Sequence, residues 1–134
     1  MFELLDIGAS ALTAQRVRMD TIAGNIANIN TLRDSDGKPN PYRRRFVVFA
    51  PGQAGDSSKP GVHVKSVSLD QSPFPKRYDP GNPDADKQGY VSYPNVDLSI
   101  EFVNALEASR AYEANVTMMD TAKSMFNSSL RLLA

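Results

Sequence analysis

All nine prolines of this chain lie in its middle part, between Pro39 and Pro94, and none lies in residues 1–38 or 95–134. Proline disrupts a helix interior because it lacks a backbone N–H and clashes with the preceding turn. This distribution predicts two helical termini around a non-helical centre. We therefore expect a mainly α fold with an N-terminal helix over 1–33, an insert over 34–94 and a C-terminal helix over 95–134.

The N-terminal segment carries an apolar stripe with heptad spacing. The stripe consists of Leu5, Leu12, Met19 and Ile26 at intervals of seven residues, with Ile22 and Ile29 three positions after the last two. These are the positions along which one helix packs against another in a coiled coil. Gly8 and Gly24 each weaken such a helix by about 1 kcal/mol relative to Ala. We therefore expect this helix to depend on packing against a partner.

The C-terminal segment carries a longer stripe of the same kind. One row consists of Leu98, Ala105, Tyr112, Met119, Phe126 and Leu133, and a companion row of Phe102, Val116 and Leu130. Asn95 or Asp97 can cap the helix start. The two terminal helices are expected to pair as a single helical domain, as an antiparallel or splayed coiled coil. The apolar positions left over predict contacts with neighbouring subunits.

The middle segment is rich in proline and glycine and predicts only short strands. We expect strands at Arg45–Phe49, at Val62–Leu69 with a bulge near Lys65–Ser66, and at Gly89–Tyr93. A polar loop over 53–60 separates the first two, and a proline-rich stretch before the third favours an extended or turning path. At best, these strands form a minor three-stranded sheet.

The composition leaves little room for catalysis or cofactor binding. Without Cys there is neither a disulfide nor a thiolate site, and the single His63 has no motif around it, so we interpret it as a surface residue. Asp79, Asp84 and Asp86 lack the spacing of a calcium loop and indicate a turn. No phosphate-binding glycine pattern occurs. We expect no enzyme, no cofactor and no metal.

The charges argue against nucleic acid as a partner. The 15 basic and 15 acidic residues balance, whereas bulk attraction to nucleic acid needs a basic face. The basic run Arg43, Arg44 and Arg45 is too short to change this. We interpret it as a solvated face or as an ionic contact with another subunit.

Targeting signals are also missing, which on this evidence alone favours the cytoplasm. No stretch reaches the ~18 apolar residues of a membrane span. The first residues carry Glu3 and Asp6 where a secretory signal would carry Lys or Arg. A cytoplasmic helical adaptor or scaffold protein would show the same stripes and the same balanced charge.

Several motifs resemble the signatures of one family. The segments Gly8–Arg16 and Asn25–Thr31, with Asn95–Asp97 and Ser109–Asn115, resemble the N- and C-terminal signatures of bacterial flagellar rod, hook and axial proteins. Within that family, the chain resembles most the short proximal rod subunits. This closer resemblance is carried by Pro41–Arg44, Tyr78–Asp86 and Gly89–Val91.

The resemblance implies a structural subunit of the flagellar basal body. Such proteins leave the cell through the flagellar type III system without a cleaved signal, which replaces the cytoplasmic prediction with a periplasmic rod. The implied assembly is a helical tube that transmits torque from motor to hook and forms part of the export channel. Its implied partners are copies of the chain, proximal and distal rod proteins, the MS ring or export gate, and other hook–basal-body components. Our candidate interface residues are Leu5, Leu12, Met19, Ile22, Ile26, Ile29, Phe102, Tyr112, Val116, Met119, Phe126, Leu130 and Leu133, with Arg43, Arg44 and Arg45 as candidate ionic contacts.

Overall fold

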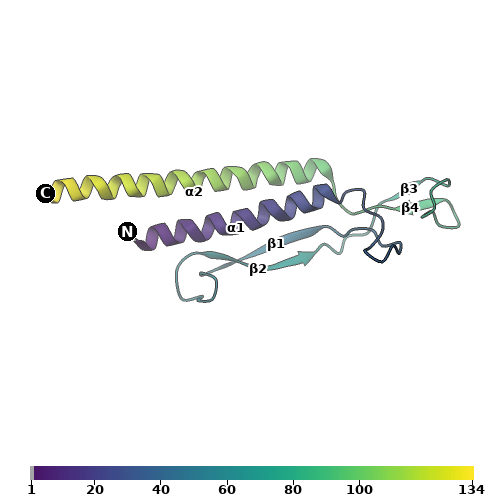
Figure 1. Ribbon diagram of the computed structural model, residues 1–134, viewed down its shortest axis with the longest axis horizontal. Helices are drawn as coiled ribbons and strands as arrows, with labels where there is room; N and C mark the ends of the chain where they lie inside the picture. The colour runs from purple at the N-terminus through teal and green to yellow at the C-terminus, as the bar shows by residue number, and fades with distance from the viewer. Residues whose placement is uncertain (1) are drawn as a thin grey trace.

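The computed structural model describes residues 2–134. The order of elements is α1 (Phe2–Ala27), β1 (Arg45–Pro51), β2 (Val62–Leu69), β3 (Lys76–Tyr78), β4 (Tyr90–Ser92) and α2 (Leu98–Leu133). Figure 1 shows α1 and α2 side by side and antiparallel, with every strand supplied by the middle segment. The prediction of two helical termini around a small strand-containing insert is confirmed.

The helix α1 is shorter than predicted, since it ends at Ala27 and not near residue 33. The asparagine at position 28 closes it: its Nδ2 donates to the Gly24 carbonyl at 2.8 Å, and its Oδ1 accepts from the Thr31 hydroxyl at 3.1 Å. Asparagine side chains compete in this way with the backbone bonds of a helix and favour turns. Ile29 therefore lies in the turn after α1.

The start of α2 is capped by Asp97. Its Oδ1 accepts from the backbone N–H of Ser99 at 2.9 Å and of Ile100 at 3.3 Å, two donors that have no partner within the helix. Asn95, the other predicted cap, bonds to a different part of the chain. Neither α1 nor α2 has a stretch long and apolar enough to cross a membrane.

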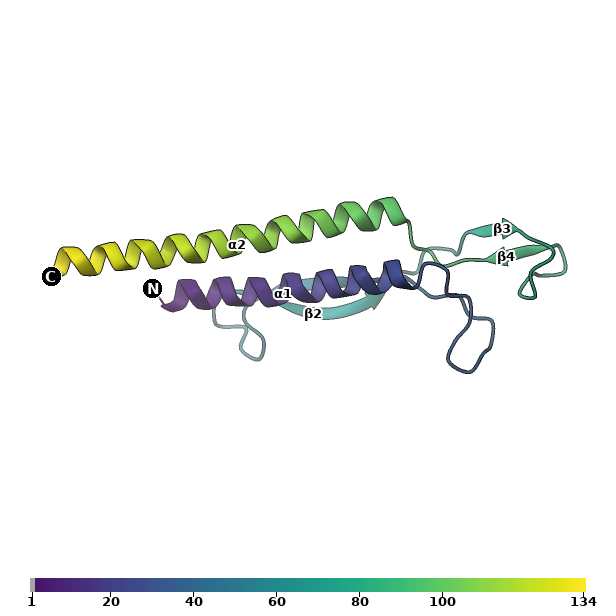
Figure 2. The ribbon, with the colours of Figure 1, turned by 45° about the horizontal axis from the view of Figure 1, so that its top comes forward.

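The strands β1 and β2 form an antiparallel hairpin that lies along α1 (Figure 2). Pairing runs from Arg45 with Leu69 to Pro51 with Val62, and Lys65 is left unpaired between Ser66 and Val64. The extra residue is a β-bulge. Both strands and the position of the bulge are confirmed.

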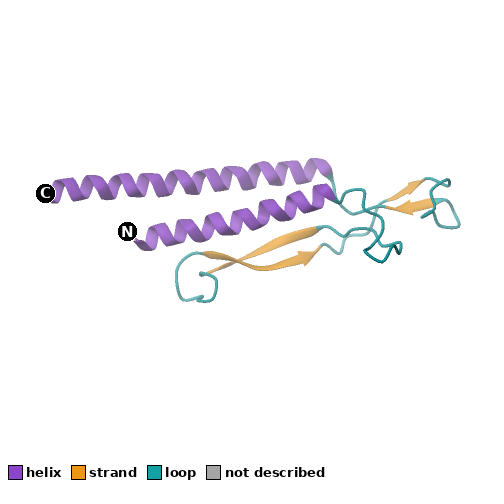
Figure 3. Cartoon of the chain, in the orientation of Figure 1, coloured by secondary structure: helices purple, strands orange, loops and turns teal. Residues whose placement is uncertain are grey.

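The strands β3 and β4 form a second, separate hairpin at the end of the molecule away from both termini (Figure 3). The expected single sheet of three strands is therefore wrong, and β3 was not predicted. Lys76–Tyr78 pairs with Ser92–Tyr90, and the rings of Tyr78 and Tyr90 meet edge to face with centroids 5.4 Å apart. This aromatic contact across the ladder helps to stabilise so short a hairpin.

The two helices meet through small residues. The buried apolar residues of α2 are Ala108 and Ala122, and those of α1, which packs on both α2 and the β1–β2 hairpin, are Ala14 and Ile22. Gly8 lies against Met118 and Met119 of α2. Small side chains let two helices approach closely, so this contact differs from the predicted seam of large apolar residues.

Candidate assembly interface and the polar junction beside it

A buried polar junction lies where the end of α1 meets the start of β1 and of α2. At its centre is Asn25 of α1, whose side chain is fully buried. Its Nδ2 donates to the Arg45 carbonyl at 2.8 Å, and its Oδ1 accepts from the Arg45 N–H at 3.0 Å and from the Tyr42 hydroxyl at 3.0 Å. Asn25 thus bonds to the backbone of Arg45 as a neighbouring strand would, and it fastens β1 to α1.

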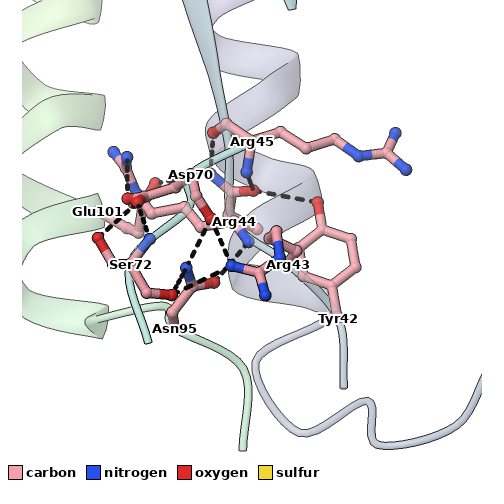
Figure 4. A network of polar contacts seen from close by, with 9 residues as sticks. Tyr42, Arg43, Arg44, Arg45, Asp70, Ser72, Asn95 and Glu101 are labelled. Atoms are coloured by element: carbon pink, nitrogen blue, oxygen red, sulfur yellow. Dashed lines mark hydrogen bonds and ion pairs between the residues drawn. The ribbon is translucent and has the colours of Figure 1, made fainter. Parts of the chain in front are cut away.

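The same amide reaches α2 through Glu101, which is also fully buried. Asn25 Nδ2 donates to Glu101 Oε2 at 3.2 Å, and Arg44 Nε donates to Glu101 Oε1 at 2.5 Å (Figure 4). Arg44 also forms an ion pair with Asp70, with Nη1 and Oδ2 3.4 Å apart. A buried carboxylate needs such partners because its desolvation is costly.

Asn95, just before α2, ties the turn after β2 to the same junction. Its Oδ1 accepts from the Arg44 N–H at 2.7 Å, and its Nδ2 donates to the carbonyls of Asp70 and Ser72 at 3.0 and 3.1 Å. Arg43 donates to the same two carbonyls at 2.9 and 3.1 Å (Figure 4). The junction therefore joins α1, β1, the turn after β2, and α2.

The environment shifts two pKa values at this junction. Hydrogen bonds from Ser72, helped by the charge of Arg44, lower the pKa of Asp70 below its usual 3.8. Burial raises the pKa of the Tyr42 hydroxyl, and the nearby Glu101 carboxylate adds to this against the opposing effect of Arg45. Both shifts favour the usual charge states at neutral pH, a carboxylate at Asp70 and a neutral hydroxyl at Tyr42.

The chemistry of the junction is that of a structural contact between elements of the fold. Its carboxylates and guanidinium groups are bonded to one another and to the backbone. Among residues 2–134, no group of three or more His, Asp or Glu side chains is placed to hold a metal ion. His63, away from the junction, is half-buried and its Nδ1 lies 2.9 Å from the Gly52 carbonyl oxygen.

The predicted seam residues fall into two groups. The first group is buried or half-buried. Ile22 is buried, and the half-buried members are Leu5, Leu12, Met19, Ile26, Ile29, Tyr112, Met119 and Phe126. Two contacts place members of this group between the helices. Met19 Sδ lies 3.7 Å from the Ser109 hydroxyl oxygen, and Met119 packs on Gly8.

The second group is exposed on α2. Phe102, Val116, Leu130 and Leu133 keep 57, 37, 48 and 85% of their surface exposed. The buried residues of α2 are Glu101, Ala108 and Ala122, spaced by seven and fourteen. Each residue of the row that begins at Phe102 follows the buried row of Glu101 by one position. One position corresponds to a rotation of ~100° around the helix axis, because a helix has 3.6 residues per turn. The structure therefore does not bring Phe102, Val116 and Leu130 together with the α1 stripe.

The three arginines also differ in how far their side chains are bonded within the chain. Arg44 pairs with Glu101 and Asp70 of its own chain, and Arg43 bonds to two carbonyls and lies over the ring of Phe74, 4.2 Å from its centroid. Arg45 is exposed, with its guanidinium 5.7 Å from the ring centroid of Tyr42. Of the three, Arg45 has the side chain most available to another molecule.

Sequence reasoning missed Asn25, Asn95 and Glu101 as junction residues. The sequence positions of two of them, Asn25 and Glu101, could have indicated a buried contact. Asn25 is a polar residue between Ile22 and Ile26 of the stripe, and Glu101 stands seven residues before Ala108 on the face that proved to be buried. A polar residue at such a position commonly specifies how helices pair.

Comparison with known proteins places these features in a family. Residues 5–33 match the model described as flagella basal body rod protein, and residues 87–132 match the C-terminal model of flagellar basal body rod FlgEFG proteins. The flagellar basal-body rod protein FlgC of Borreliella burgdorferi is 43% identical, over 99% of this chain and 97% of its own length. The FlgC proteins of Escherichia coli O6:H1 and Bacillus subtilis are 44 and 40% identical, each over 98% of this chain and 97% of their own length.

Proposed function

The chain belongs to the FlgC family of flagellar basal-body rod proteins and is a structural rod subunit of the flagellar basal body; from that membership we propose that it polymerises into the helical tube of the proximal rod. The tube transmits torque from motor to hook and forms part of the export channel. The observation that carries this proposal is the apolar surface that α2 leaves uncovered.

Large apolar side chains lie exposed along much of α2. They are Leu98, Ile100, Phe102, Val103, Leu106, Val116, Met125, Leu130, Leu132 and Leu133. Exposed apolar surface on this scale marks interaction sites, since water contact with it is unfavourable. Copies of the chain would cover it, and the residues Phe102, Val116 and Leu130 would complete a coiled-coil seam between subunits.

The unequal helix lengths favour an open assembly. In Figure 1, the C-terminal end of α2 extends past the start of α1, and this end carries Leu130, Leu132 and Leu133. An end that offers apolar residues to a different surface of the next copy makes a heterologous contact. Repeated heterologous contacts produce a filament when they do not close into a ring.

The insert suits contacts on the outside of such a tube. The β3–β4 hairpin lies beyond the helix pair, at the end opposite the C-terminus (Figure 2). We place the helices around the channel and the insert outward, facing proximal and distal rod proteins, with the MS ring, export gate and hook–basal-body components as neighbours along the axis. Arg45 would form ionic contacts between subunits. No catalysis and no cofactor enter this role.

Export without a cleaved signal fits the same role. The flagellar type III system would carry the chain unfolded to the periplasm, where folding accompanies assembly. The absence of Cys suits a chain that passes into an oxidising compartment. Helices weakened by Gly8 and Gly24 would resist threading less than strong helices do.

Cell fractionation tests the proposal. We expect the tagged full-length chain in purified basal bodies, and a deletion strain without rods whose motility the wild-type chain restores. Recovery of the chain in the soluble fraction alone, with normal rods in the deletion strain, would contradict the proposal and favour the cytoplasmic adaptor.

A further inference from the structure

The apolar stripes alone leave the alignment of the two helices ambiguous. On α1 the stripe repeats every seven residues from Leu5 to Ile26, and on α2 it repeats every seven residues from Leu98 to Leu133. A shift of one heptad, ~10 Å along the axis, would again set apolar residues against apolar residues. The stripes alone therefore do not select the alignment in which Met19 meets Ser109 and Gly8 meets Met119.

We propose that the buried cluster Asn25, Arg44 and Glu101 selects this register. Glu101 is fully buried, and its two oxygens are bonded by Asn25 of α1 and by Arg44, the residue just before β1. The hydrogen bonds between the Asn25 side chain and the Arg45 backbone hold the preceding residue, Arg44, close to Asn25. A one-heptad shift would move Glu101 seven residues along α1, away from both partners, and would leave its carboxylate without them.

A buried ionic cluster of this kind favours one arrangement more than it adds stability. Desolvation offsets most of the attraction within the correct pair, whereas a buried carboxylate without partners is strongly unfavourable. A single buried polar residue is known to fix register in helix pairs for this reason. Other polar contacts between the helices, such as the ion pair of Arg18 with the exposed Glu107, carry little of this selectivity, because a solvated carboxylate keeps its water when the pair is broken.

The register has a consequence for assembly, which rests on the proposed function. It decides how far α2 extends past α1, and so which of the exposed residues Leu130, Leu132 and Leu133 a neighbouring copy meets. A subunit shifted by one heptad would present a different end to the growing rod. The cluster would thereby act as a specificity determinant for the polymerising surface.

Crosslinking in the isolated full-length chain measures the register directly. The chain has no cysteine, so pairs can be introduced one at a time. Met19→Cys is combined with Ser109→Cys to report the observed register, and with Phe102→Cys or Val116→Cys to report the two one-heptad shifts. A short bismaleimide joins whichever pair is adjacent. With the native cluster we expect the Met19–Ser109 pair to crosslink at least roughly tenfold faster than either shifted pair.

The same three pairs are then measured with the cluster replaced by apolar residues, Arg44→Met with Glu101→Leu. Asn25 keeps its bonds to Arg45 and Tyr42 in this variant, and circular dichroism reports whether the helices persist. We expect the preference for Met19–Ser109 to fall to roughly threefold or less. The matched control is Arg18→Met with Glu107→Leu, which removes the ion pair between α1 and α2 whose carboxylate is exposed and should leave the preference unchanged.

Three outcomes would overturn the proposal: an unchanged preference in the apolar variant, an equal loss of preference in the control, or no preference with the native cluster. Loss of helical structure in the apolar variant would also overturn it, because the cluster would then hold the fold and not its register. These results come from the isolated chain. They can therefore be separated from a failure of the proposed function, which would appear as absence of the chain from basal bodies.

Discussion

Gly8 of α1 and Met119 of α2 lie so close together that a methyl group built on Gly8 would stand 2.6 Å from Cγ and 2.8 Å from Sδ of Met119. Glycine at position 8 therefore permits the approach of the two helices. The other glycine of α1 has no such role. At Gly24, the nearest atom to an added methyl group is the Tyr42 hydroxyl oxygen at 3.9 Å, an ordinary contact.

Substitution of the two glycines by alanine should therefore change the free energy of unfolding in opposite directions. Gly24→Ala should raise the free energy of unfolding by up to about 1 kcal/mol, because alanine favours the helix. Gly8→Ala gains the same propensity but forces Met119 to move, and overpacking costs about 1–3 kcal/mol. We expect a net loss of roughly 1 kcal/mol in urea denaturation. Equal stabilisation by both substitutions would contradict the close approach at Gly8.

The ion pair of Arg44 with the buried Glu101 should matter far more to stability than the ion pair of Arg18 with the exposed Glu107. Arg44→Met leaves the Glu101 carboxylate buried with only the Asn25 amide, and we expect a loss of about 3 kcal/mol. Arg18→Met should cost less than about 0.5 kcal/mol. Adding Glu101→Leu to Arg44→Met should recover most of the loss, which a double-mutant cycle by denaturation measures. Equal costs for the two arginines would refute this account.

Asp70 should make the stability of the folded chain depend on pH in the acid range. Its pKa is lowered in the folded chain, chiefly by hydrogen bonds from Ser72 and further by the charge of Arg44. A carboxyl group whose folded pKa is lowered contributes stability at pH values above its unfolded pKa, and this contribution is lost as pH falls through the folded pKa. We therefore expect the Asp70 contribution to be complete at neutral pH and to disappear as pH falls below its usual pKa of 3.8.

Thermal unfolding between pH 2 and pH 7 checks this, with Asp70→Asn as the comparison. The difference in melting temperature between the two proteins should shrink toward the acid end. Ser72→Ala should shrink it as well, since the first cause of the shift is removed. A difference that stays constant over the whole range would exclude the assigned cause.

The exposed row of α2 should be needed for assembly and not for folding of the single chain. Val116→Asp should abolish rods and swimming while changing the free energy of unfolding by less than about 0.5 kcal/mol, as is usual for exposed positions. Met119→Asp should abolish both folding of the helix pair and rods, because it puts a charge against Gly8. Ser124→Asp, at another exposed position of α2, serves as the control. Normal swimming of the Val116→Asp strain would contradict the assembly surface.

Arg45 should form the ionic contacts between subunits. Its backbone is held by Asn25 whatever its side chain, and its guanidinium is exposed. Arg45→Glu should therefore leave the isolated chain stable but make purified rods dissociate at lower salt, while Arg45→Lys should behave like the native chain. Rods whose salt resistance is the same with Glu, Lys and Arg at this position would show that Arg45 makes no such contact.

The sequence predicted those features that depend on local chemistry. The proline distribution located the insert, the two candidate caps Asn95 and Asp97 marked the start of α2, and the changed alternation around Lys65 located the bulge. The choice of packing face depended on tertiary contacts. Large residues at Phe102, Val116 and Leu130 favoured a seam there, yet a close contact through Gly8, Ala108 and Ala122 with buried Glu101 formed instead.

The junction was unpredictable for a related reason. Asn25, Arg44, Asp70, Asn95 and Glu101 are far apart in the chain and share no spacing that a helix or strand would impose. Their proximity follows from the antiparallel pairing of the helices and the course of the hairpin along α1. Two of these residues gave a local signal that a specific contact was required: Asn25 is a polar residue inside an apolar stripe, and Glu101 stands seven residues before Ala108.

A density map of the purified basal body, at a resolution that separates helices, tests the central claim most directly. We predict α1 and α2 of each copy in the innermost layer around the export channel, with the exposed row of α2 against a neighbouring copy and the β3–β4 hairpin at larger radius. A map with the insert lining the channel, or one without this chain in the rod, would contradict the account.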